Sequence, residues 1–555
     1  MNILGLFSPI KSLQRLNRRK IRINYMNDLH RIDQELRDLI ADMSFQKTKR
    51  VLMGPSFSIY EPCFIHDRIL SYALRLRGAE IIPMYCDAVQ SIECNFYGGV
   101  WKTGSFAENC QHCIQRSSML WEDNPIPAVS LSKYINYSDI EKIIKKVSSM
   151  SAEECFVYIE DGLPFGSWAR DILVNNYVVG NYQLIADYEV LGRAHLRNLL
   201  LIRIAYERAL ADIKPECAVS NDSYYGMWAI LQVLCEKNAI PFYSHWSGGR
   251  QGTWCYAYND ATMNLDFTKS WKNFSKMQLS SRQKDKVQGW LYRRLEGKEM
   301  VFDTASLAKH QKESADLDGL DLSKPTALLA ANLIWDLLAL NKQIVFEGMI
   351  EWIGETINWF NKHPNYQLII KPHPAELHPS MPATKERVEI ALKERGVLFT
   401  QNIFILSPKA KITVYELFPI IKVGLVHTST VGIEMAGRGL PVITTARAPY
   451  RGFGFTLDPL NKKDYFDILK KTLDEEKSII LNGQPDLSWK FILFYQYHYY
   501  TKINIMDYKL GQVPRLKIKT AIDLLPGKNK HLDYVVDSIM EGLPILDEER
   551  WPSES

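Results

Sequence analysis

Residues 423–437, with the sequence Val-Gly-Leu-Val-His-Thr-Ser-Thr-Val-Gly-Ile-Glu-Met-Ala-Gly, decide the fold of this chain. The apolar start predicts a buried strand, and the pattern from Val431 onward predicts a helix. Three hydroxyl residues stand at the expected helix N-terminus, where free backbone N–H groups favour an anion: Thr428, Ser429 and Thr430. The segment therefore predicts an anion site, although an ordinary Ser/Thr helix cap has the same pattern.

Two further residues of this segment suit a nucleotide. Gly432 allows a close approach to the backbone. Glu434 lies one turn into the helix, where its carboxylate can accept hydrogen bonds from ribose hydroxyls. We therefore expect a ligand that carries both a phosphate and a sugar.

A second segment, residues 368–376, reads Leu-Ile-Ile-Lys-Pro-His-Pro-Ala-Glu. An apolar strand runs into Lys371, His373 and Glu376, and two prolines stiffen the turn. A rigid turn that presents a cation and an imidazole suits a phosphate or a leaving-group oxygen. Taken alone, His373 could equally fill the turn and bond to backbone, but two such loops on one sheet favour a diphosphate or nucleotide monophosphate.

Strands that alternate with helices surround both segments and indicate parallel sheets covered on both faces. In the C-terminal half we expect strands at 327–331, 367–371, 397–399, 421–426 and 441–444, with helices at 346–360, 386–394 and from 431. In the N-terminal half we expect strands at 50–54, 79–85, 154–159, 217–220 and 240–244, with a helix at 65–77.

The predicted organisation is α/β, with two Rossmann-like domains of doubly wound parallel sheet that face a cleft. The expected ranges are a basic N-terminal segment with an amphipathic helix (1–48), a first domain (49–294), a polar linker (295–325), a second domain (326–484) and a helical tail (485–555). The linker contains Asp316-Leu-Asp318, a metal-binding pattern that arises easily by chance in polar sequence.

Composition excludes several classes of protein. The 555 residues are 46% hydrophobic and 23% charged, which is typical of globular proteins and not of disordered ones. The net charge of +4 is too small to indicate nucleic-acid binding. Because no run of 18 apolar residues occurs, we expect no transmembrane helix.

The N-terminus is apolar over residues 1–10, and six basic residues follow without an acid: Lys11, Arg15, Arg18, Arg19, Lys20 and Arg22. A secretory signal has the reverse order, so we expect a cytoplasmic protein whose nine cysteines are thiols. The basic stripe could contact an anionic inner-membrane surface as a peripheral protein, or it could be a solvated end.

Four of the cysteines fall within 28 residues: Cys86, Cys94, Cys110 and Cys113. The Cys-x-x-Cys spacing of the last two is a good half-site for zinc, and the first pair is more widely spaced than usual. A structural zinc, buried thiols and a redox pair are the three interpretations. No metal is assigned to catalysis.

Further motifs carry a resemblance. Asn332-Leu-Ile-Trp-Asp336, Lys-Pro-His-Pro-Ala-Glu, Thr-Ser-Thr-Val-Gly-Ile-Glu-x-Ala, Gly-x-Pro-Val and Tyr-Arg-Gly-x-Gly-Phe occur in that order. Together they resemble bacterial capsule-polysaccharide-biosynthesis glycosyltransferases, which are GT-B proteins related to Kdo transferases. The resemblance covers about 326–469 well and is weaker over 50–249.

The resemblance implies that His373 and the Ser-Thr pair hold a nucleotide phosphate, that Glu434 holds the ribose and that the loop 403–408 borders the base. His373 is also expected to be catalytic. The full expected donor set adds residues from the same loops: Asn332, Asp336, Lys371, Glu376, Thr428, Ser429, Thr430, Glu434 and Arg451. Arg451 could equally be a surface arginine. GT-B enzymes generally need no metal.

Transfer to a hydroxyl also needs a base from the first domain. Asp222 follows the strand ending Ala218-Val-Ser220 and is the first candidate, with Asp161 as its rival. Weaker candidates are Glu61, His66 and His245. Each of these residues could instead form a turn or a cap.

The expected function is therefore glycosyl transfer from a nucleotide-sugar, with a CMP-linked acid such as CMP-Kdo favoured, to a surface-polysaccharide or glycolipid hydroxyl. Three alternatives stay open. Two are enzymes on the same fold, a sugar-nucleotide epimerase and a polyol-phosphate transferase. The third is a non-catalytic nucleotide- or glycan-binding partner of an assembly complex.

Overall fold

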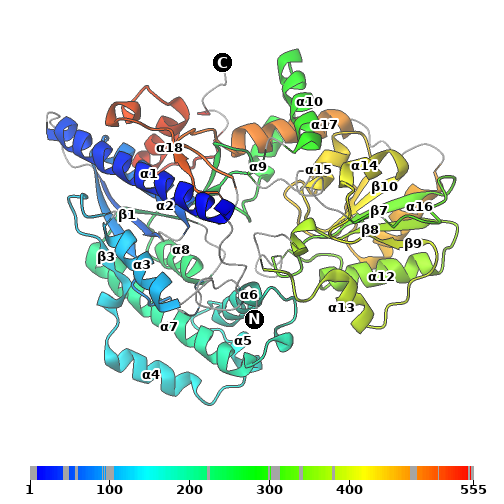
Figure 1. Ribbon diagram of the computed structural model, residues 1–555, viewed down its shortest axis with the longest axis horizontal. Coiled ribbons are helices and arrows are strands. Elements are labelled where there is room, and N and C mark those ends of the chain that lie inside the picture. Colours follow the sequence, from blue (N-terminus) through cyan, green and yellow to red (C-terminus); the bar gives the residue numbers. More distant parts are fainter. Residues whose placement is uncertain are drawn as a thin grey trace.

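The structure is a computed structural model. It describes residues 9–41, 49–56, 60–90, 92, 94, 100, 106–119, 121–221, 226–297, 300–301, 313–314, 316–336, 342–377, 382–475, 484–509, 512–547 and 550–551. The chain forms two α/β halves, each built on one sheet, and helices α9, α10 and α17 lie between them in the view of Figure 1.

The N-terminal half contains a six-stranded sheet in the order β3-β2-β1-β4-β5-β6. Its strands are β1 (Lys49–Ser56), β2 (Ala79–Tyr85), β3 (Val129–Ser130), β4 (Cys217–Asn221), β5 (Phe242–Ser247) and β6 (Trp254–Tyr258). All neighbours pair in parallel except β5 and β6, which are antiparallel.

The sheet is buried on both faces because successive side chains of β1 point to opposite sides. Val51 and Met53 enter one core with α1 and α2, and Leu52 enters the other core with α6, α7 and α8. The helices of this half are α1 (Pro9–Ala41), α2 (Glu61–Arg75), α3 (Phe106–Met119), α4 (Tyr137–Val147), α5 (Ala152–Phe156), α6 (Phe165–Tyr177), α7 (Tyr188–Ile213) and α8 (Gly226–Lys237).

The C-terminal half contains a five-stranded, fully parallel sheet in the order β11-β10-β7-β8-β9. Its strands are β7 (Thr326–Ala330), β8 (Gln367–Lys371), β9 (Ile403–Ile405), β10 (Val423–Val426) and β11 (Val442–Thr444). Because β7 lies between β10 and β8, the loops that follow these three strands meet at one edge of the sheet.

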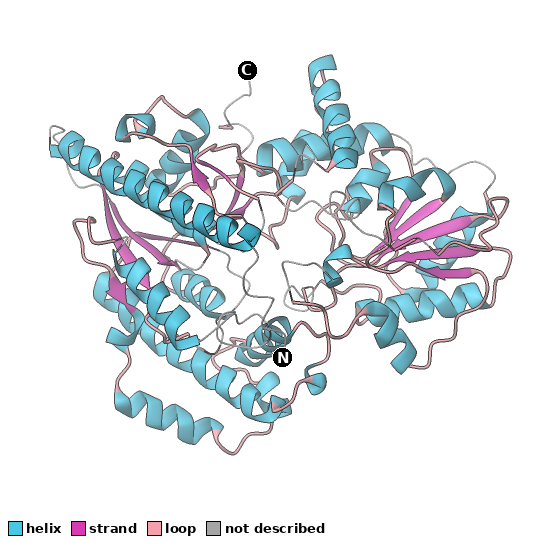
Figure 2. Cartoon of the chain, viewed as in Figure 1, coloured by secondary structure: helices cyan, strands magenta, loops and turns pink. Residues whose placement is uncertain are grey.

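Helices cover both faces of this second sheet as well (Figure 2). Alternate residues of β7 enter two separate cores, with Leu328 in one and Leu329 in the other. The helices are α9 (Thr268–Phe274), α10 (Ser281–Glu296), α12 (Met349–Asn361), α13 (Val388–Glu394), α14 (Val414–Leu417), α15 (Val431–Ala436), α16 (Lys462–Asp474) and α17 (Gln484–Leu493).

The C-terminal tail packs first on one half and then on the other. Helix α17 and the π-helix Phe494–Tyr499 belong to a core shared with β7 and β10. The chain then returns to the N-terminal half, where helix α18 (Lys530–Glu541) packs against α2. A short antiparallel pair, β12 (Met506–Asp507) and β13 (Arg515–Leu516), interrupts the predicted helical tail.

Most predicted strands are present, and two are wrong. Residues 154–159 do not form a strand, because Ser151 and Glu154 form a reciprocal capping box that starts α5. Residues 397–399 form no strand either, and the edge strand next to β8 is β9. The prediction missed β6, which adds an antiparallel edge to the first sheet.

Candidate nucleotide-binding site

A cavity of about 160 Å³ opens at the carboxyl edge of the second sheet. Residues at or after the ends of β7, β8 and β10 line it, as do Ile412 to Tyr415 around the start of α14 and Arg294 from α10. Five residues that the sequence singled out for donor binding line this one cavity: Lys371, His373, Ser429, Thr430 and Glu434.

Lys371 and His373 supply the cationic and hydrogen-bond-donating side of the cavity. The Lys371 side chain is buried, which lowers its pKa to about 8 although Glu416 acts in the opposite direction. The backbone N–H of Ala375 donates to His373 Nδ1 at 3.1 Å. Because Nδ1 accepts this bond, the proton of the neutral imidazole is on Nε2, which is then a donor.

Ser429 and Thr430 lie in the turn that leads from β10 into α15. Helix α15 has only six residues, so its dipole is smaller than that of a long helix and the hydroxyl and backbone donors matter more. The Tyr450 hydroxyl donates to the Ser429 carbonyl at 2.5 Å and holds this turn in place.

Gly432 has a different role from the one predicted. A Cβ atom at this position would lie 2.1 Å from Tyr450 Oη, so the close approach that requires glycine is made by the Tyr450 phenol and not by a ligand. The glycine therefore serves the site indirectly, by allowing Tyr450 to reach the backbone of Ser429.

Glu434 is already engaged by a residue that sequence reasoning missed. Arg294 Nε donates to Glu434 Oε1 at 3.0 Å, and the side chains are only 8% and 2% exposed. Glu434 Oε2 has no hydrogen-bond partner within the described part of the chain. A ribose hydroxyl could donate to this second oxygen while Arg294 keeps the first. No local signal identifies Arg294, because it lies 140 positions earlier in the chain.

The other predicted donor residues lie outside the cavity lining. The Thr428 N–H donates to Asn332 Oδ1 at 3.3 Å, which joins the loops after β7 and β10. Asp336 is exposed. Glu376 is fully buried and accepts from the Val388 N–H at 3.2 Å, and burial raises its pKa to about 7.

The remaining predicted donor residue, Arg451, lies outside the cavity lining and is engaged by backbone and side-chain oxygens of the second half. Its Nη1 atom donates to the Thr444 carbonyl at 2.5 Å and to Thr444 Oγ1 at 2.8 Å, and Nη2 donates to the Pro459 carbonyl. The guanidinium therefore fastens the loop after β11. Ile412 to Tyr415 line the cavity, and the predicted base-binding loop 403–408 contributes the Ser407 carbonyl, which accepts from Lys371 Nζ at 3.5 Å.

None of the candidate acceptor-side bases that the structure describes lines the cavity. Asp222 lies outside the described residues. Asp161 pairs with Arg203 at an exposed turn. Glu61 accepts from Arg22 Nε at 2.8 Å, from Tyr25 at 2.7 Å and from Arg116 at 3.0 Å, so it is a structural clamp. Burial raises the pKa of Glu61, but these partners outweigh burial and lower it.

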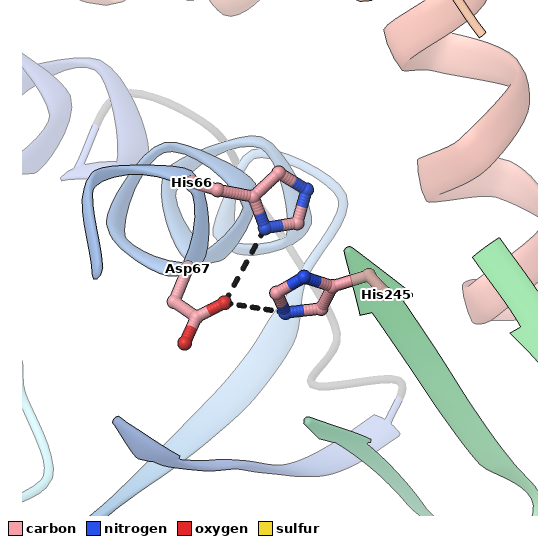
Figure 3. Close-up of side chains that lie close together, drawn as sticks. All are labelled: His66, Asp67 and His245. Atoms are coloured by element: carbon pink, nitrogen blue, oxygen red, sulfur yellow. Dashed lines mark hydrogen bonds and ion pairs between the residues drawn. The ribbon is translucent and has the colours of Figure 1, made fainter. Parts of the chain in front are cut away.

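The two histidine candidates meet in a buried cluster with Asp67 (Figure 3). His245 Nε2 lies 2.6 Å and His66 Nδ1 3.3 Å from Asp67 Oδ1, and all three side chains are almost fully buried. Burial and the neighbouring His245 lower the pKa of His66 to about 3, so His66 is neutral. Burial raises the pKa of Asp67, but the two histidines outweigh it and lower that pKa.

In the described part of the chain, this cluster is the one group of three or more potential metal ligands. Its hydrogen bonds oppose metal binding. Trp254 donates its indole N–H to His245 Nδ1 at 3.0 Å, so the imidazole proton faces Asp67 on Nε2. A metal on Nε2 would move that proton to Nδ1, against the Trp254 donor. The arrangement is therefore a buried polar network that joins α2 to β5.

The four clustered cysteines are described residues and form no such ligand group. Cys86 and Cys94 lie on the segment after β2, and Cys110 and Cys113 lie in α3. Burial raises the pKa of the Cys86 thiol well above its ordinary value, and the neighbouring thiols of Cys113 and Cys94 act in the same direction, so these three cysteines lie within electrostatic range of one another. A structural zinc at these cysteines therefore stays a prediction.

Comparison with known proteins finds similarity to solved structures alone. No family model and no curated protein matches it. Similar structures include a KpsC β-Kdo 2,4-transferase of Thermosulfurimonas dismutans, with 10% identity over 50% of this chain and 79% of that one and a TM-score of 0.32. The β-Kdo 2,7-transferase of the same organism has 14% identity over 52% and 80%, with a TM-score of 0.30.

A third similar structure is the UDP-GlcNAc 2-epimerase of Methanocaldococcus jannaschii in complex with UDP-GlcNAc and UDP. It has 12% identity over 80% of this chain and 98% of that one, with a TM-score of 0.28.

Among the described residues, none of the helices is long and apolar enough to cross a membrane. Two doubly wound sheets, with a cavity at the carboxyl edge of the second, give this chain a GT-B fold.

Proposed function

We propose that this chain is a GT-B glycosyltransferase that moves a sugar from a nucleotide-sugar to a hydroxyl of a surface polysaccharide or glycolipid. A CMP-linked acid such as CMP-Kdo is the favoured donor, from the resemblance of the sequence motifs. The observation that carries the proposal is the cavity that gathers Lys371, His373, Ser429, Thr430 and Glu434. Cationic and hydroxyl groups beside a carboxylate suit a phosphate joined to a ribose.

The chemistry follows from these donors. As the bond between the anomeric carbon and the phosphate oxygen breaks, negative charge grows on the leaving phosphate. The Lys371 ammonium and the His373 Nε2–H stabilise that charge, and the buried position of Lys371 strengthens the interaction. These groups would supply charge neutralisation from the protein itself.

The acceptor oxygen forms the new bond to the anomeric carbon and gives up its proton to a base. We assign this role to Asp222, which directly follows the last residue of β4, Asn221. The carboxyl end of that strand is where ligands bind in doubly wound sheets. The other candidates are engaged elsewhere, in ion pairs or in the buried histidine network.

A thermal-shift panel of CMP, CDP, UDP, GDP and ADP tests the donor site. A nucleotide that binds only the folded state stabilises it by about 2.7 kcal/mol at a hundredfold excess over Kd. We expect a selective shift with CMP. His373→Ala should weaken that binding about tenfold or more, since a charge-assisted hydrogen bond contributes about 1.5–3 kcal/mol. His363→Ala, outside the cavity, is the matched control.

Transfer from CMP-Kdo to a glycan or glycolipid acceptor tests the reaction itself. We expect His373→Ala to abolish transfer and Asp222→Asn to lower kcat. A selective shift with UDP or GDP would replace the favoured donor and keep the fold. Absence of any nucleotide shift, or transfer by His373→Ala at near wild-type rate, would overturn the assignment of the site.

A further inference from the structure

Helix α1 lies along the N-terminal half (Figure 1), and its side chains enter the core from Tyr25 onward. The side chains of Tyr25, Leu29, Ile32 and Leu36 are buried in the core that also contains α2 and α18. Their spacing of three or four residues is that of a helix with one apolar stripe. This part of the helix therefore behaves as a fixed element of the domain.

The anchored part begins at a cluster around Glu61 on α2. Arg22 and Tyr25 from α1, together with Arg116 from α3, donate to the Glu61 carboxylate over 2.7–3.2 Å. The clamp fixes the direction in which the more N-terminal turns of α1 leave the body of the protein.

Ahead of this clamp, α1 changes character. Among residues 16–24, all side chains are exposed except Ile21, which is half-buried. Two of them are large and apolar, with Leu16 64% and Ile23 49% exposed. Seven residues bring a helix back to nearly the same direction, so Leu16 and Ile23 share one face.

Basic residues flank that apolar face. Arg19 and Lys20 lie between Leu16 and Ile23 at helical spacings of three and four residues, one on each side of the line that joins them. From residue 1 to residue 27 the sequence has six basic residues and no acidic one. The charge of this helix end is therefore uniformly positive.

We propose that residues 16–23 of α1 form a docking surface for an anionic lipid bilayer. Exposed apolar side chains flanked by lysine and arginine match the interface of acyl chains and anionic headgroups. A soluble polyanion would satisfy the charges but would leave Leu16 and Ile23 in water. With two apolar side chains, the contact is reversible and depends on both terms. The surface is independent of the proposed sugar transfer.

Vesicle flotation with the full chain tests this surface. We expect binding to vesicles of phosphatidylcholine with 30% phosphatidylglycerol, no binding to phosphatidylcholine alone, and release as salt rises from about 0.05 M to about 0.5 M. Two double variants separate the terms: Arg19→Glu with Lys20→Glu, and Leu16→Ser with Ile23→Ser. Each should weaken binding about tenfold or more.

Matched controls lie on other exposed surfaces. Lys269→Glu with Lys272→Glu makes the same change of charge on α9. Leu398→Ser with Leu460→Ser removes two exposed apolar side chains elsewhere on the surface. Both controls should bind vesicles like the wild type. Thermal melts and the nucleotide shift should be unchanged in the α1 variants, because the substituted side chains face solvent.

Three results would overturn the proposal. The first is no binding of the wild type to anionic vesicles. The second is an equal loss of binding in the controls, which would point to net charge alone. The third is loss in the charge variant with full binding by the Leu16→Ser and Ile23→Ser variant, which would show that the contact is electrostatic alone and that the apolar face plays no part in it.

Discussion

Glu434 and Arg294 form the pair on which the ribose side of the cavity depends. Both side chains are buried and both line the cavity. Without its partner, either one would be an unpaired charge in a medium of low dielectric constant. Arg294→Met should therefore cost about 3–5 kcal/mol of unfolding free energy, because it leaves the Glu434 carboxylate buried without its cation. Chemical denaturation measures this loss.

The double variant Arg294→Met with Glu434→Gln is the control for that pair. Because it removes both charges together, it should recover part of the stability that Arg294→Met loses. Both variants should bind nucleotide more weakly than the wild type. Equal denaturation midpoints for Arg294→Met and the wild type would show that the pair is not buried in solution.

At the scale of the element, the turn from β10 into α15 is set by the contact between Gly432 and Tyr450. Gly432→Ala would place a methyl group 2.1 Å from Tyr450 Oη and displace the phenol from the Ser429 carbonyl. We expect a loss of stability of about 1–3 kcal/mol, typical of overpacking, together with weaker nucleotide binding. Thermal melts with and without CMP measure both effects.

A second substitution separates the clash from other effects of the glycine. Tyr450→Phe removes the oxygen that the new methyl group would meet, so Gly432→Ala with Tyr450→Phe should be more stable than additivity predicts. If the loss of stability in the double variant equals the sum of the losses in the two single variants, the proposed contact is contradicted. Tyr450→Phe alone should loosen the turn, since the Ser429 carbonyl loses its side-chain donor and keeps the Gly432 N–H at 3.2 Å.

The elements show why sequence patterns predicted this sheet well. β8 and β10 are largely apolar runs, and both faces of the sheet are buried, so pattern and structure agree. The pattern failed at 154–159, where an apolar run over Phe156 to Ile159 suggested a strand but the capping box of Ser151 and Glu154 started a helix. Local capping outweighed the propensity of the run.

The site shows the limit of the same reasoning. Lys371, His373 and Ser429 were found because strand ends in a parallel sheet converge at a known edge. Arg294 was not found, because its contact with Glu434 joins α10 to α15 across 140 positions. Arg451 shows an ambiguity of the pattern, since an arginine after a strand can bind backbone carbonyls, as it does here, as well as a phosphate.

At the scale of the whole molecule, the two halves are joined at more than one place. The Glu386 carboxylate accepts from the backbone N–H groups of Gly180 at 2.7 Å and Asn181 at 2.9 Å, which ties a loop of the first half to the second. The tail adds a second connection, since α17 packs on the second half and α18 on the first. Stability is therefore expected to be shared between the halves.

Buried histidines determine how that shared stability responds to acid. Burial lowers the pKa of His66 and His195 to about 3 and that of His427 to about 4, against an ordinary value near 6.5. The unfolded chain therefore binds protons below about pH 6.5 while the folded chain does not. The contribution of these histidines to the free energy of unfolding is fully present above about pH 6.5, and it is lost as the pH falls toward 4.

From pH 7 to pH 5, each such histidine should cost about 2 kcal/mol of unfolding free energy. Glu376 acts in the opposite direction, because burial raises its pKa to about 7 and the folded state takes up a proton there between pH 7 and pH 5. Its gain in unfolding free energy offsets the loss from about one histidine. Urea denaturation at the two pH values should show a net loss. In His195→Leu that loss should be about 2 kcal/mol smaller. An equal loss in His195→Leu and the wild type would show that His195 gains its proton without unfolding.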